Sequence, residues 1–167
     1  QGTAGAITRN RVTNTRNGIQ VQPYQVIQGV SPSVCGDNTF SVYKTGIYYN
    51  YAELTASPWS IKDNTVTAVQ PPANPTGPLG WEGIKAETMR ANGSGGTIEN
   101  NIVDGTGAVS DNIKWWGVYG MRYAGASSTS SQVNFTGNTV SNVEIGFVHD
   151  AAADIVFTGN SLSASQK

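Results

Sequence analysis

Few side chains in this chain are suited to acid–base, nucleophilic or metal chemistry. His149 is the only histidine and stands directly before Asp150, and Cys35 is the only cysteine. An imidazole beside a carboxylate can work in general acid–base catalysis, and a thiol can act as a nucleophile. One His and one Cys cannot supply a structural zinc site, and no glycine-rich phosphate-binding loop follows a strand. The sequence therefore predicts no metal and no cofactor.

The position of these residues depends on a repeat that runs through the chain. An apolar residue, two further residues, Asn, one further residue and a second apolar residue form a phrase that occurs six times. Its asparagines lie at intervals of 28, 26, 37, 37 and 22 residues. These intervals hold three short strands and three turns, and no segment keeps the 3.6-residue apolar period of a helix. The asparagines are Asn10, Asn38, Asn64, Asn101, Asn138 and Asn160.

A second phrase, Gly followed by an apolar residue, opens a strand after each of the first five asparagines. We assign it to Gly18, Gly46, Gly83, Gly117 and Gly146. The Asn-to-Gly spacing is eight residues in three repeats, and it is 19 and 16 residues in the other two. Insertions at residues 70–81 and 104–116 account for the longer spacings, as expected for loops that leave the outside of a coil.

The two phrases predict an all-β fold, a right-handed parallel β-helix (β-solenoid) of about five coils. Residues 1–167 then form one β-helix domain, which is either a fragment of a longer solenoid or a fibre subunit. The asparagines would stack at about 4.8 Å, the strand spacing, and form a ladder of amide hydrogen bonds. A turn asparagine also tolerates the left-handed backbone region. The first apolar residue of each phrase should point inside, which makes Cys35 an inert core thiol.

The phrases from about Ala6 to Leu162 resemble the repeats of the pectate-lyase-like superfamily of parallel β-helix proteins. The resemblance implies the fold but no single activity, because that superfamily includes pectate lyases, polygalacturonases, alginate epimerases, phage tailspikes and non-catalytic surface proteins. The chain has neither the paired aspartates with Gly-His-Gly of polygalacturonases nor the Asp-Pro-His of alginate epimerases.

The glycine frame assigns each strand residue to a side. The first and third residues after Gly point inward, and the second and fourth point outward. His149 falls on an inward position, which favours a partly buried structural histidine over a catalytic one. Gly120 is likewise assigned inward and Met121 outward.

The outward positions, with the tryptophans that the insertions bring to one edge, form a candidate carbohydrate-binding surface. Aromatic rings beside polar groups can stack on the C–H face of a sugar. The alternative is that these tryptophans, Trp81 included, anchor their own loops. The candidate residues are Tyr48, Lys85, Glu87, Trp115, Trp116, Tyr119 and Asp150.

An enzymatic function remains an alternative. Glu87 and Asp150 share a column two coils apart, which corresponds to about 10 Å. Inverting glycosidases hold their two carboxyl groups roughly 6.5–9.5 Å apart, so this pair is at the margin. Lys85 and Arg122 are candidate bases for a lyase, but a cluster of acids for Ca²⁺ does not accompany them. We assign no catalytic residue.

Composition narrows the partners and the location. The net charge is −1 with acids and bases interspersed, which argues against a nucleic-acid surface and against polybasic membrane contact. No apolar run approaches the length of a membrane span. The polar composition suits an extracellular or cell-surface location of a secreted protein.

The leading prediction is a non-catalytic module, a surface, fibre or adhesin component that binds glycan; the alternative is a polysaccharide-active lyase, glycoside hydrolase or epimerase. Expected partners are a second copy end to end or the rest of a longer chain, and polysaccharide.

Overall fold

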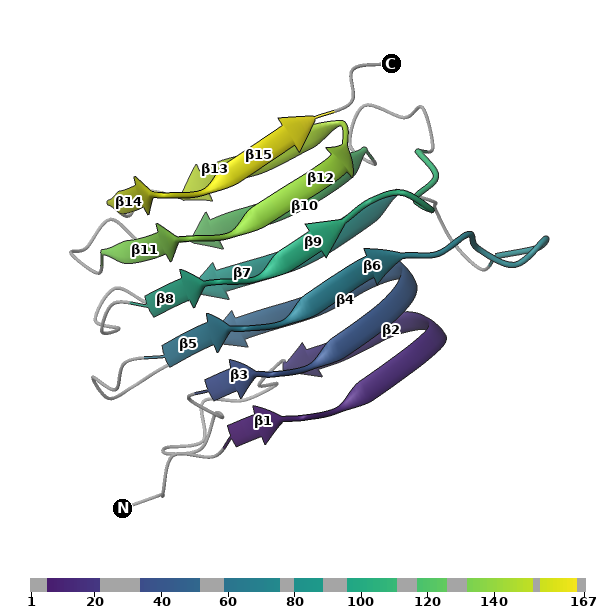
Figure 1. Cartoon of the computed structure of the whole chain (residues 1–167), viewed down its shortest axis with the longest axis horizontal. Coiled ribbons are helices and arrows are strands. Elements are labelled where there is room, and N and C mark those ends of the chain that lie inside the picture. Colours follow the sequence, from purple (N-terminus) through teal and green to yellow (C-terminus); the bar gives the residue numbers. More distant parts are fainter. Residues whose placement is uncertain are drawn as a thin grey trace.

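The computed structural model describes residues 6–21, 34–51, 59–75, 80–88, 96–110, 117–125, 132–151 and 154–164. Every regular element in these ranges is a β-strand (Figure 1). The strands are β1 (Ala6–Thr8), β2 (Arg11–Val21), β3 (Val34–Gly36), β4 (Thr39–Tyr51), β5 (Trp59–Lys62), β6 (Thr65–Ala68), β7 (Trp81–Thr88), β8 (Gly96–Glu99), β9 (Ile102–Asp104), β10 (Val118–Gly125), β11 (Val133–Thr136), β12 (Thr139–Val143), β13 (Ile145–Ala151), β14 (Ile155–Thr158) and β15 (Ser161–Ala164).

The strands pair in parallel and wind into a stack of coils with three faces. Face 1 is the six-stranded sheet β1-β3-β5-β8-β11-β14, seen as one row from bottom to top in Figure 1. The long strands β2 and β4 cross a corner of the stack: β4 pairs with β6 through Thr39–Val42 and with β7 through Thr45–Tyr51. Face 2 therefore comprises the first parts of β2 and β4 with β6, β9, β12 and β15. Face 3 comprises their second parts with β7, β10 and β13. The predicted right-handed parallel β-helix is confirmed.

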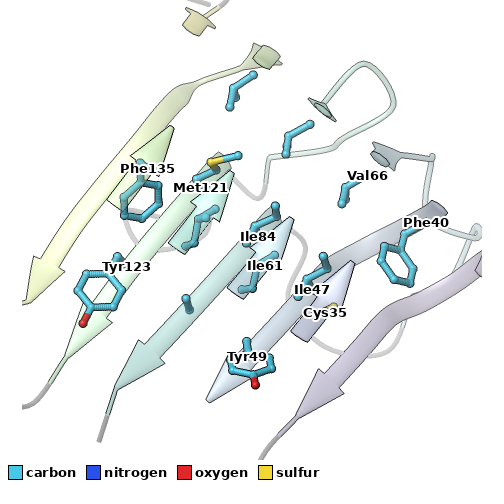
Figure 2. Packing of buried hydrophobic residues seen from close by; sticks show 14 of the residues in the cluster. Cys35, Phe40, Ile47, Tyr49, Ile61, Val66, Ile84, Met121, Tyr123 and Phe135 are labelled. Carbon is cyan, nitrogen blue, oxygen red and sulfur yellow. The ribbon is translucent and has the colours of Figure 1, made fainter. Parts of the chain in front are cut away.

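The three faces enclose a continuous apolar core in which equivalent residues of successive coils stack (Figure 2). Ile47, Ile84 and Met121 form one such column, and all three are buried. Cys35 is fully buried as predicted, and burial raises the pKa of its thiol to about 12. Phe157 occupies the position equivalent to Cys35 in the last coil and is 41% exposed, because no described coil covers it. The core is therefore complete in the middle of the stack and open at its end.

The predicted asparagine ladder is present at the turn between faces 1 and 2. In each step, both the backbone N–H and the side-chain Nδ2 of one asparagine donate to the Oδ1 of the next. For Asn64 and Asn101 these distances are 3.0 and 2.9 Å. The Nδ2 of Asn101 also donates to the backbone carbonyl of Ile61 in the preceding coil, at 3.0 Å. All four middle asparagines are buried, so this network satisfies amides that would otherwise be costly to remove from water.

The left-handed residue of this turn is the one before the ladder asparagine, which we had not predicted. Its φ lies between 53° and 64° in all six coils. A left-handed residue reverses the chain sharply and costs a residue with a Cβ roughly 1–2 kcal/mol. The asparagine itself is thereby left free to point inward. The six residues are Arg9, Asp37, Asp63, Asn100, Gly137 and Gly159.

The glycine phrase is explained by close packing between neighbouring coils. A Cβ added to Gly83 would lie 2.3 Å from Cγ1 of Val103, and one added to Gly120 would lie 2.2 Å from Cγ1 of Val140. Both valines are the second apolar residue of an asparagine phrase. Each of these valines therefore occupies the space left by the glycine of the preceding coil.

The strand register corrects our assignment of inward and outward residues in the fourth coil. Its strand-opening glycine is Gly120, not Gly117, because Met121 pairs with Ile84 and with Phe147. Met121 is consequently buried rather than outward, and Tyr119 leaves the column in which we had placed it. The Asn-to-Gly spacing becomes 19 residues in both long coils.

Replacement of a buried ladder residue should destabilise the fold more than replacement of a terminal one. Asn101→Ala leaves the backbone N–H and the Nδ2 of Asn64 without their shared acceptor, and it removes the Nδ2 donor from the carbonyl of Ile61. We expect a loss of about 1–3 kcal/mol in the free energy of unfolding. Asn10→Ala, at an exposed turn, should cost less than about 1 kcal/mol. Denaturant unfolding of both variants measures the difference, and equal losses would contradict the ladder.

The strand-opening glycines Gly18, Gly46, Gly83, Gly120 and Gly146 form a glycine column, in which alanine should be tolerated in the last coil and not in the middle. Gly83→Ala forces a methyl group against Val103 and the backbone oxygen of Gly120, with an expected cost of about 1–3 kcal/mol or more. The nearest atom to a Cβ on Gly146 is Cβ of Leu162 at 3.3 Å, so Gly146→Ala should change stability much less. Melting temperatures of the two variants test the expectation, which fails if Gly146→Ala is as harmful.

Candidate functional site

The outward side of face 3 carries a strip of charged and phenolic side chains that contact one another across coils. Register places Tyr48 of β4 beside Lys85 of β7, and Lys85 beside Arg122 of β10. Two residues further along each strand, the register joins Asn50, Glu87, Ala124 and Asp150. We define the polar strip as Tyr48, Glu82, Lys85, Glu87, Arg122 and Asp150.

One half of the polar strip centres on Glu87. The hydroxyl of Tyr48 donates to Oε2 of Glu87 at 2.5 Å, and Nζ of Lys85 lies 2.7 Å from Oε1. The same Nζ lies 4.8 Å from the centroid of the Tyr48 ring. Burial raises the pKa of Glu87, but the hydrogen bonds from Lys85 and Tyr48 and the positive charges of Lys85 and Arg122 outweigh it. The net result is a pKa of Glu87 below its ordinary value of 4.5.

The other half of the polar strip centres on Arg122, which joins three coils. Its Nη1 lies 3.3 Å from Oε1 of Glu82, and its Nη2 lies 3.2 Å from Oδ2 of Asp150. Burial lowers the pKa of the Arg122 guanidinium, but the two carboxylates together raise it above its ordinary value. The guanidinium is therefore a permanent charge that fixes acids from the coil on either side.

The structure unites part of the predicted surface and separates the rest. Tyr48, Lys85 and Glu87 lie together, and Asp150 joins them through Arg122. Glu87 and Asp150 are two coils apart, as predicted, with Ala124 between them in register. Tyr119 instead pairs with Glu82 and Ile145, outside the column of Tyr48 and Lys85.

The tryptophans have different outcomes. Trp115 and Trp116 lie outside the described residues. Trp81 is buried in the core, and its Nε1 donates to the backbone carbonyl of Val42 at 3.2 Å. Trp81 therefore belongs to the core and not to the outward surface.

The side chains of His149 and Asp150 lie on opposite sides of β13. His149 follows the inward column and stacks on Tyr123, with ring centroids 6.2 Å apart and planes 7° apart. Asp150 points to the other side of the strand, toward Arg122. Our expectation that His149 is partly buried is wrong, because β13 is the last described strand of face 3 and the imidazole is exposed.

Sequence reasoning missed Glu82, and it considered Arg122 only as the base of a lyase. The signal that would have placed both is the equality of the two 37-residue intervals. Because the third and fourth coils have the same length, their glycines must have the same offset, which makes Gly120 the equivalent of Gly83. Arg122 then aligns with Lys85, one cation above the other.

The arrangement is a set of paired charges rather than an open reactive centre. Each of its carboxylates has an ion pair with Lys85 or Arg122. Among the described residues, no three His, Cys, Asp or Glu side chains gather where they could hold a metal ion. The same ranges contain no helix that could cross a membrane. Comparison with protein-family models, with curated proteins and with solved structures finds no match.

The ionic contacts of Glu87 predict a specific dependence on acid. Because the folded-state pKa of Glu87 is lowered, its contribution to stability is present above the unfolded-state pKa and is lost as pH falls through the folded-state value. Glu87→Gln should therefore lower stability at pH 7 by at most about 1 kcal/mol, and should lose less stability than the parent below about pH 4.5. Asp154→Asn, a change of an exposed carboxylate outside the strip, is the control. Parallel pH curves for the parent and Glu87→Gln would contradict the assignment.

Proposed function

We propose that this chain is a non-catalytic, extracellular β-helix module that serves as a surface, fibre or adhesin component, of the kind found in the pectate-lyase-like superfamily. The observation that carries the proposal is the polar strip, in which each carboxylate is already engaged by a cation. Such a surface is pre-ordered for contact and poorly suited to proton transfer.

The chemistry of the strip weighs against the alternative of a polysaccharide-active enzyme. A glycosidase needs one carboxyl group with a raised pKa to protonate the leaving group. The pKa of Glu87 is instead lowered. A base that abstracts a proton must itself be able to lose one, and the pKa of Arg122 is raised.

A polysaccharide is the partner that best suits this strip. Arg122 presents a planar fork, and the carboxylates and the Tyr48 hydroxyl add hydrogen-bonding groups at successive coils. The coils rise by about 4.8 Å, so the groups form a line suited to an extended chain of hydroxyl-bearing units rather than to a compact ligand. Lys85 and Glu87 are 20% and 21% exposed, so binding would not have to immobilise long, free side chains.

Glycan binding and turnover can be measured on the same preparation. Arg122→Gln removes two charge-assisted hydrogen bonds, and we expect binding to a glycan array to weaken by about tenfold or more. Lys62→Gln changes a cation on face 1 and should leave binding unchanged. Melting temperatures establish that both variants are folded. Release of reducing ends or of unsaturated uronates by the parent, abolished in Glu87→Gln, would contradict the non-catalytic proposal. An array on which Arg122→Gln binds as well as the parent would contradict the glycan-binding surface.

A further inference from the structure

The two ends of the stack expose different and complementary edges. Figure 1 shows β1 at the bottom of the stack and β14 and β15 at the top. In the top coil, Phe157 and Leu162 are both 41% exposed, although they occupy inward positions of faces 1 and 2. In the bottom coil, the equivalent positions are held by Ile7 and Val12, which are half-buried.

The hydrogen bonds of the ladder have one direction, and they leave opposite groups at the two ends. Each of the first five ladder asparagines donates its backbone N–H to the Oδ1 of the following one, and the final step from Asn138 to Asn160 is 2.9 Å long. Within the described residues, the backbone N–H of Asn160 therefore has no acceptor and the Oδ1 of Asn10 has no donor. A donor at one end thus matches an acceptor at the other.

The backbone beside the ladder repeats this polarity. The residue after each ladder asparagine donates to the carbonyl of the asparagine one coil earlier, as Thr39 does to Asn10 at 2.9 Å and Ser161 to Asn138 at 2.8 Å. By the same rule, the N–H of Arg11 points out of the bottom end, and the carbonyl of Asn160 points out of the top end.

The charges of the two ends are opposite. Residues 6–21 contain three arginines and no acid, whereas residues 144–164 contain three acids and neither Lys nor Arg. Lys167 lies outside the described residues. Opposite charge on two surfaces speeds their encounter and disfavours contact between like ends. The charged residues are Arg9, Arg11 and Arg16 at the bottom, and Glu144, Asp150 and Asp154 at the top.

We propose that the occupant of the top end is the bottom end of a second copy of this chain. Its β1 adds to β14 and the first part of its β2 adds to β15, so that Ile7 covers Phe157 and Val12 covers Leu162. The N–H of Asn160 donates to the Oδ1 of Asn10 in the second copy, and the ladder continues from one copy into the next. This contact is heterologous and does not close, so it propagates into a filament. The inference rests on the proposed function and specifies how a fibre component would associate.

Two variants, each blocking one end, distinguish this contact from any other association. Leu162→Lys places a charge at the exposed top, where the lysine stem replaces the leucine packing. Arg11→Pro removes the N–H that points out of the bottom, and proline is tolerated in such an edge strand. Each variant alone should remain monomeric in sedimentation equilibrium, because one of its ends is blocked. An equimolar mixture should form a 1:1 dimer that grows no further, since one intact top meets one intact bottom. Ile102→Lys, a change of an exposed apolar residue in the middle of face 2, should associate like the parent.

The parent should increase in mass with protein concentration, and the increase should become weaker as salt is added. A parent that stays monomeric up to about 0.5 mM, well above the micromolar range of ordinary association, would overturn the proposal. So would end variants that still self-associate, or a mixture that stays monomeric. If circular dichroism shows that Arg11→Pro is unfolded, the double variant Arg9→Glu, Arg11→Glu takes its place, with the same expected results. Failure of these experiments would leave the non-catalytic role standing, because turnover and glycan binding test that role separately.

Discussion

The buried asparagine turn is the constraint on which the rest of the structure depends. An amide placed in an apolar interior must have its hydrogen bonds satisfied, and here only the neighbouring coils can do so. That requirement aligns one turn above another from Asn10 to Asn160. Once the turns are aligned, the strands of face 1 that precede them and the strands of face 2 that follow are in register as well. The apolar columns are therefore a consequence of the ladder as much as a cause of the fold.

The glycine column transmits this alignment to face 3. Val66, Val103 and Val140 each follow a ladder asparagine and each occupy the space beside a glycine of the preceding coil. Any shift of face 3 would bring a Cβ or a carbonyl against these methyl groups. Both insertions lie between the two constrained positions of their coils, so the ladder and the glycines stay in register although these coils are longer. Residues 70–75, in the described part of the first insertion, extend away from the coils (Figure 1).

The sequence allowed the fold to be predicted because its strongest signals are local and repeated. Six copies of one phrase determine the ladder, and Cys35 could be placed in the core because it replaces Ile or Phe in that phrase. The polar strip was harder to predict, since a glycine three residues too early moved Tyr119 into a position that belongs to Arg122. The contacts of Arg122 with Glu82 and Asp150 join residues 40 and 28 positions apart, respectively, and only the correct register brings them together. The exposure of His149 could not be inferred from alternation, because alternation gives the side of a strand and not whether another coil lies above it.

The two coils of 37 residues show how the solenoid fixes the distance between equivalent surface residues. Lys85 and Arg122 are equivalent residues of successive coils, and they stand one strand separation apart on a backbone whose spacing is set by hydrogen bonds rather than by side-chain choice. A group placed on this face is therefore held at a multiple of about 4.8 Å from its equivalents. Substitutions on this face therefore change the chemistry of each group without changing the distance between equivalent groups.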